Sequence, residues 1–138
     1  MLVRDITPND TAAILEIAHS CDLPEEWEWP SGAFGAVAVD LGDVVAFCAL
    51  KEIAIYGLSI EEIWCFPTFD GRKGLSALSD WIESVAQSMA NDRGRPIKAG
   101  GVVRLDNSAH RHALIKRDFH KVADVMAKDF FPKMEATP

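Results

Sequence analysis

The segment with the clearest capacity for chemistry is a short turn that carries two glycines and two basic residues: Gly71, Arg72, Lys73 and Gly74. A strand-like stretch ends just before this turn at Pro67, and a strongly periodic helical stretch begins directly after it at Leu75. Free backbone N–H groups and the positive end of the helix dipole would face the turn, so an anion such as a phosphate could bind there. The same residues are equally consistent with a polar surface loop whose glycines ease a tight turn.

Two adjacent carboxylates, Glu61 and Glu62, lie in the strand-like stretch before the turn. A carboxylate in a cleft can act as a general base for a substrate ammonium, provided that its pKa is raised or that water relays the proton. Successive side chains of a strand face opposite sides, so at most one of the two can point into a cleft. The other interpretation of Glu62 is a solvent-facing strand residue, and alternation alone leaves its face open.

Periodicity predicts the elements that must position these residues. Strand-like stretches lie at residues 2–6, 33–39, 44–50, 60–66, 97–103 and 120–126. Helical spacing predicts a helix that begins at Thr7, a long helix from Leu75 to about residue 91, and a short helix from Asn107 or Ser108 to about residue 117. This order is typical of a mixed α/β or α+β domain. We predict one domain over residues 1–131 and a loose tail over residues 132–138.

Composition limits the compartment and the partners. The 138 residues are 49% hydrophobic and 25% charged, with a formal net charge of −7, so direct binding to nucleic acid or to an anionic membrane is not expected. The longest apolar run, residues 44–50, is far shorter than the roughly 20 residues of a membrane-spanning helix. From the first residues we expect no secretory signal, and the three cysteines are widely spaced. We expect a cytoplasmic protein with neutral or cationic partners.

Three segments resemble the GNAT superfamily of acetyl-CoA-dependent N-acyltransferases, and together they extend over nearly the whole chain. Residues 4–10 are similar to the family's opening strand and helix cap, and residues 62–67 with the following turn are similar to its pyrophosphate motif. Residues 107–119 resemble its late pattern of an asparagine, a helix and a closing Gly-Phe. The resemblance implies an α+β fold with a central mixed, mostly antiparallel sheet and helices on both faces. Two central strands would splay to leave a cleft beside the turn.

The resemblance also implies roles for individual residues. The residues that would hold the acyl-CoA are Cys65, Phe66, Gly71, Arg72, Lys73 and Gly74, with Asn107 on the pantetheine side. Glu62 falls where relatives place a general base. Acetyl-CoA is the implied cofactor and a small primary amine the implied acceptor. No metal site is expected, because His110 and His112 face different ways on their predicted helix.

The chain departs from the family's pattern at positions that carry the reaction. In a gapless alignment the arginine or glutamine that begins the pyrophosphate loop becomes Asp70, and a carboxylate repels a pyrophosphate. A shift of one residue places Gly71 there instead. The tyrosine that usually protonates the leaving thiolate is replaced by Leu114, which has no proton to donate, and the closing glycine is replaced by Asp118.

A second resemblance concerns the late segment, where Asn107, His110 and Leu114 stand as in the GNAT-fold proteins of some tailed bacteriophages, internal virion proteins among them. The sequence therefore favours a degenerate acyl-CoA site on a scaffold kept for protein contacts, such as those with phage particle proteins inside a virion. The alternative is an active enzyme that moves an acetyl group from acetyl-CoA to a primary amine. Trp27 and Trp29 would contact an amine or a protein partner, or would simply cover the first helix.

Overall fold

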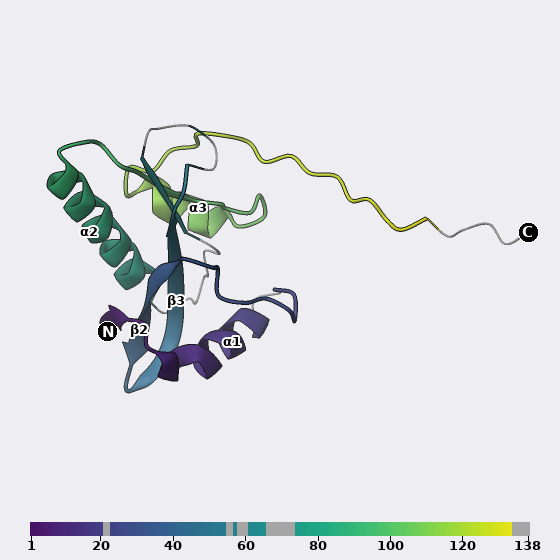
Figure 1. The fold of residues 1–138 in the computed structure, drawn as a ribbon, viewed down its shortest axis with the longest axis horizontal. Helices are drawn as coiled ribbons and strands as arrows, with labels where there is room; N and C mark the ends of the chain where they lie inside the picture. Colours follow the sequence, from purple (N-terminus) through teal and green to yellow (C-terminus); the bar gives the residue numbers. More distant parts are fainter. Residues whose placement is uncertain (21–22, 55–56, 58–60, 66–73, 134–138) are drawn as a thin grey trace, which may run out of the picture.

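The computed structural model describes residues 1–20, 23–54, 57, 61–65 and 74–133, and its fold is drawn in Figure 1. The elements are β1 (Leu2–Asp5), a 3-10 turn (Pro8–Asp10), α1 (Thr11–Ser20), β2 (Phe34–Asp40), β3 (Asp43–Glu52), β4 (Glu62–Cys65), α2 (Leu75–Arg93), β5 (Lys98–Gly101) and α3 (Ser108–Ile115). All the predicted helices and all but one of the predicted strands are present. The long helix runs to Arg93, slightly past the predicted end near residue 91, and Gly94 closes it with a φ of +63°.

The strands form one five-stranded sheet in the order β1-β2-β3-β4-β5. The first four strands pair antiparallel in sequence, and β5 joins β4 in parallel. The strands predicted at residues 33–39 and 44–50 form a hairpin, in which Asp40 pairs with Asp43 across a turn where Leu41 and Gly42 both have positive φ. The sheet is therefore mixed and mostly antiparallel, and the fold class expected from the sequence is confirmed.

Helices cover both faces of the sheet, and in Figure 1 α1 and α2 lie on opposite sides of β2 and β3. On one face Leu78 of α2 packs against small strand residues, Ala38 and Ala46 among them, which let the helix approach closely. On the other face Ile14 and Ala18 of α1 pack against Phe47. The predicted apolar stripes of both helices thus face the sheet.

The two tryptophans of the loop after α1 belong to this second layer. The ring centroids of Trp27 and Trp29 lie 5.7 Å and 6.1 Å from that of Phe47. Trp29 also donates its indole N–H to the backbone oxygen of Ala33 at 3.0 Å. A Cβ on Gly35 would meet the Trp29 ring at 2.7 Å and the Cys48 backbone oxygen at 2.0 Å, so the close packing here requires glycine. Both tryptophans thus pack against the cluster that α1 forms with β2 and β3, and their contact with an amine or a protein partner stays a prediction.

The predicted last strand, residues 120–126, is wrong. Residues 120–133 contain neither helix nor strand, and all of them are exposed. Figure 1 shows this segment running away from the rest of the chain. A strand needs a neighbour for its backbone groups, and the strand-like sequence here has none within its own chain in the described structure.

Candidate functional site

The first turn of α2 is the described part of the predicted phosphate site. Gly74 precedes the helix with a φ of +97° and offers no side-chain cap, so the first N–H groups of α2 have no acceptor within the helix. A Cβ at Gly74 would lie 2.8 Å from the Cβ of Ala38 and 3.3 Å from that of Ala46. Close packing of this turn on the sheet therefore requires a glycine at position 74, whether or not the turn binds a phosphate. The other predicted residues of the turn, Phe66, Gly71, Arg72 and Lys73, lie outside the described residues.

Glu62, the predicted general base, is the first residue of β4 and is 1% exposed. Its carboxylate accepts a hydrogen bond from the indole N–H of Trp64 at 3.0 Å. Both side chains lie on the sheet face opposite α2, because the intervening Ile63 packs in the cluster that α2 covers. The Trp64 ring in turn covers Gly100 of β5, where a Cβ would approach it to 2.6 Å. Trp64 was not singled out from the sequence, although its spacing of two residues from Glu62 places both on one face.

The adjacent Glu61 has a different environment. Its carboxylate accepts a hydrogen bond from Arg95 at 2.7 Å and lies 3.5 Å from the guanidinium of Arg93. Arg93, in the last turn of α2, also binds Glu52 at the end of β3, and its hydrogen bonds lower the pKa of that carboxyl. Glu61 is thus part of an ion-pair network between α2 and the sheet. Glu62 is the member of the pair that faces the other side.

Cys65 and Glu62 do not share a face of the sheet. Cys65 is buried with Cys48 in the cluster under α2. Burial raises the pKa of the Cys48 thiol to about 12, and the nearby Cys65 thiol adds to the rise. A thiol buried in apolar surroundings is a packing group. The predicted acyl-CoA contact of Cys65 uses its backbone, so the burial of its side chain leaves that prediction untested.

The four pairs between β4 and β5 run from Glu62 and Lys98 to Cys65 and Gly101 without a break. The predicted parting of two central strands is therefore absent from the paired rows that the structure describes. Pairing ends at Cys65, and the next residue of that strand lies outside the described part of the chain. The open cleft beside the turn thus remains a prediction.

Asn107 caps α3 with its side chain. Its Oδ1 accepts the backbone N–H of His110 at 3.0 Å, which satisfies one of the free donors of the helix. The predicted contact of Asn107 with a pantetheine would have to use the amide nitrogen, which makes no hydrogen bond to any described residue. The end of α3 is held by Arg117, a residue that the sequence did not suggest. Its guanidinium lies 2.8 Å from Asp80 and donates to the Ser76 hydroxyl of α2 at 2.9 Å.

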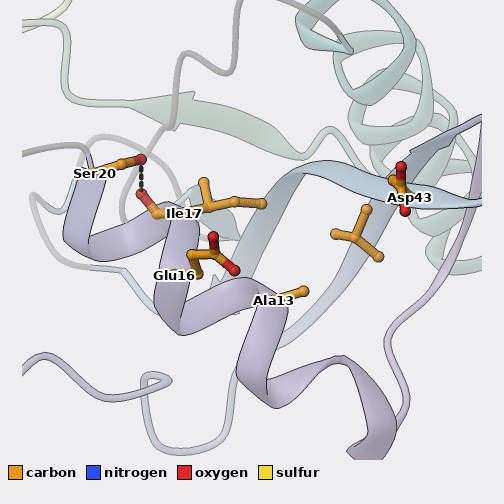
Figure 2. Close-up of a pocket in the computed structure, with 6 residues that line it drawn as sticks. Ala13, Glu16, Ile17, Ser20 and Asp43 are labelled. Carbon is orange, nitrogen blue, oxygen red and sulfur yellow. Dashed lines mark hydrogen bonds between the residues drawn. The ribbon is translucent and has the colours of Figure 1, made fainter.

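A pocket of about 430 Å³ lies between α1 and the start of β3 (Figure 2). Glu16 and Asp43 place carboxylates at it, whereas the Ser20 hydroxyl donates to the Ile17 backbone oxygen at 2.7 Å. None of the predicted site residues lines this pocket. Among the described residues, no group of three His, Cys, Asp or Glu side chains could hold a metal ion. No helix in that same part of the chain is long and apolar enough to cross a membrane.

Comparison with solved structures identifies the fold. An aminoglycoside 6'-N-acetyltransferase from Acinetobacter haemolyticus superposes with a TM-score of 0.69 at 11% identity, over 98% of this chain and 100% of that one. A second such enzyme, from Acinetobacter baumannii, gives 0.63 at 14% identity over 96% and 99%. A ribosomal-protein-alanine N-acetyltransferase from Brucella melitensis gives 0.61 at 15% identity over 95% and 100%. No protein-family model matches the sequence, and no curated protein does.

The chain therefore has the GNAT acyl-CoA N-acyltransferase fold. The similarity extends over nearly the full length of both chains, while the identities are so low that it defines the fold alone. The fold expected from the sequence motifs is confirmed.

Proposed function

We propose that the protein is an N-acetyltransferase that moves an acetyl group from acetyl-CoA to a primary amine. The observation that carries the proposal is the placement of Glu62: a buried carboxylate on β4, facing away from α2 and oriented by Trp64. A buried carboxylate with a fixed orientation is suited to accept a proton from an attacking amine through a water. Its neighbour Glu61 lies on the other side of β4 and accepts a hydrogen bond from Arg95.

The first turn of α2 fits the pyrophosphate of acetyl-CoA. Its first N–H groups have no acceptor within the helix, and together with the helix dipole they favour a negative group beside Gly74. The exposed carboxylates of Asp80 and Glu83 would repel a phosphate, but Arg117 lies 2.8 Å and 2.6 Å from them and offsets their charge. Gly71, Arg72, Lys73 and the backbone of Cys65 and Phe66 complete the proposed cradle, with Asn107 on the pantetheine side.

The reaction forms a bond between the amine nitrogen and the thioester carbon and breaks the bond from that carbon to sulfur. Glu62 takes the proton of the amine, directly or through a water. Leu114 has no proton to give to the thiolate leaving group, so that proton would come from solvent, to which Glu62 would return the one it accepted. A cationic acceptor suits the acidic chain, and the aminoglycosides and the ribosomal-protein alanine named for the structural neighbours supply two probe classes.

A specific pair of observations favours a second function, in which the scaffold serves protein contacts, as in a phage particle, and the acyl-CoA site is degenerate. Glu62 is 1% exposed, so an amine has little direct access to it. Leu114 and Asp118 stand where the family places its acid and its closing glycine. In this function acetyl-CoA binding is weak or lost.

Titration calorimetry with acetyl-CoA and CoA separates the two functions. The enzyme should bind both in the micromolar range, and absence of heat at millimolar ligand would reject it. Glu62→Gln should then lower kcat for an aminoglycoside or a peptide amine by about a hundredfold or more, while the Kd for acetyl-CoA stays unchanged. Glu61→Gln is the matched control and should retain the rate. Equal rates for the two variants would exclude Glu62 as the base.

A further inference from the structure

The pocket between α1 and the start of β3 combines an apolar wall with two separated carboxylates. The wall consists of Ala13, Ile17 and Val44, which are all half-buried. Figure 2 shows Ala13 and Ile17 pointing from α1 toward the strand that carries Asp43. Glu16 of the helix and Asp43 of the strand place their carboxylates at the pocket from two different elements. The volume of about 430 Å³ leaves room for a long aliphatic side chain.

The two carboxylates are not neutralised within the described chain. Ion pairs are present at Asp10, Glu52 and Glu61, among other acidic residues, but neither Glu16 nor Asp43 takes part in an ion pair between described residues. None of the six residues that line the pocket is basic. The net charge of −7 adds to the negative potential. The pocket is therefore complementary to a group with a hydrocarbon stem and a cationic end.

Lysine fits this description better than arginine does. Its four-carbon stem can lie along an apolar wall while its ammonium group stays in contact with water. The ammonium group has three rotatable N–H donors, so it can face two carboxylates that come from separate elements. The planar guanidinium of arginine is suited instead to one carboxylate that it binds with two parallel hydrogen bonds.

The turn that precedes Asp43 exposes an apolar side chain in a strained conformation. Leu41 is 97% exposed and has a φ of +51°, and the next residue, Gly42, has a φ of +86°. Two successive positive φ values favour Asn-Gly at the tip of a hairpin, and a leucine adds strain there. Because the side chain is almost fully exposed, packing within the domain does not offset this strain. Strained residues of this kind concentrate at binding sites.

The shape of the pocket favours a lysine that belongs to a protein over a free amine. Glu16, Ser20 and Asp43 are exposed and the apolar wall is only half-buried, so the pocket is open to water. A site for a small molecule encloses most of its ligand. A lysine of a protein is held in place by the rest of its chain. Leu41, two residues before Asp43, offers that chain a second contact.

We propose that this pocket and Leu41 form a docking site for a protein partner, which inserts a lysine side chain between Glu16 and Asp43 and places an apolar residue on Leu41. The site is separate from Glu62. Asp43 begins β3, whereas β4 pairs with the far end of that strand, at Leu50 to Glu52. Roughly 30 Å of strand lie between them. The docking site therefore does not depend on whether the protein transfers acetyl groups.

Nuclear magnetic resonance of the isotope-labelled full chain tests the site with three probes. The first is a short peptide with one lysine next to one leucine in an otherwise neutral alanine-glycine sequence. At millimolar concentration it should shift the amide signals of residues 13–20 and 41–44 and leave those of α2 unchanged. The second peptide has norleucine in place of the lysine and should bind about tenfold more weakly. The third probe, n-butylamine, should bind more weakly than the lysine peptide.

Variants of the chain locate the contacts. Glu16→Gln combined with Asp43→Asn should weaken binding of the lysine peptide about tenfold, whereas Asp92→Asn, an exposed change on α2, should not alter it. Leu41→Asn creates the favoured Asn-Gly turn, so it should raise the melting temperature and still weaken peptide binding several-fold.

Three results would overturn the proposal. The first is an absence of shifts at residues 13–20 and 41–44 with the lysine peptide at millimolar concentration. The second is equal affinity for the lysine and norleucine peptides. The third is n-butylamine that binds as tightly as the lysine peptide, which would identify a small-molecule site instead. A Leu41→Asn variant that is more stable and binds the peptide as the wild type does would refute the assignment of Leu41 to the site.

Discussion

Gly74→Ala is the sharpest test of how α2 is seated on the sheet. The substitution introduces two costs: alanine at a φ of +97°, and a Cβ that would lie 2.8 Å from the Cβ of Ala38 and 3.3 Å from that of Ala46. The backbone cost is about 1–2 kcal/mol. Crowding against two packed strand residues adds about 1–3 kcal/mol, so we expect the free energy of unfolding to fall by about 2–5 kcal/mol.

Gly94→Ala is the matched control, because Gly94 ends the same helix with a φ of +63° and nothing within 4 Å of its added Cβ. It should lose only the backbone cost of about 1 kcal/mol. Urea unfolding of both variants gives the difference, and Ala38→Gly in the Gly74→Ala background should recover part of it as a favourable coupling energy. If the two glycine variants lose the same stability, α2 is not seated on Ala38 as the structure has it.

Three further predictions concern stability and reactivity. Phe47→Ala removes a fully buried ring from under the tryptophans and should cost about 3–5 kcal/mol in urea unfolding, and a loss below 1 kcal/mol would contradict its place in the core. Asp10→Asn should cost about 1–2 kcal/mol at pH 7, because hydrogen bonds from Arg4 and Thr7 hold the pKa of Asp10 well below its usual 3.8. The wild type should remain more stable than Asp10→Asn at pH values above 3.8, and this difference in unfolding free energy should shrink as the pH falls below 3.8. A difference that does not depend on pH would exclude the ion pair. The Cys48 thiol, with its pKa raised to about 12, should resist iodoacetamide at pH 8 until the protein unfolds, as mass spectrometry of labelled peptides would show.

Local patterns predicted the fold well where they determine structure without help from distant residues. The alternating spacings of three and four residues after Leu75 define the face of α2, and the Asp40 to Asp43 turn defines the hairpin register. Residues 120–126 show the opposite case. A strand-like sequence forms a strand only when a neighbouring strand pairs with its backbone groups. The Arg117 contacts with α2 could not be predicted either, since they join residues 34 or more positions apart.

The two glutamates of β4 show why the candidate site needed the structure. Alternation in the sequence put Glu61 and Glu62 on opposite faces but gave no reason to choose between them. The position of α2 decides which glutamate faces it. The apolar residues of α2 pack against Ile63, and its last turn brings Arg93 to Glu61. Glu62 is thereby left beside Trp64 on the face that α2 does not cover. To predict which glutamate is the base, one would need to know where α2 packs, and that helix begins 13 positions further along the chain. The same packing that seats Gly74 on Ala38 also decides which of the two carboxylates faces away from α2. If Glu62 is the base that we propose, stability and activity should change together when α2 is displaced.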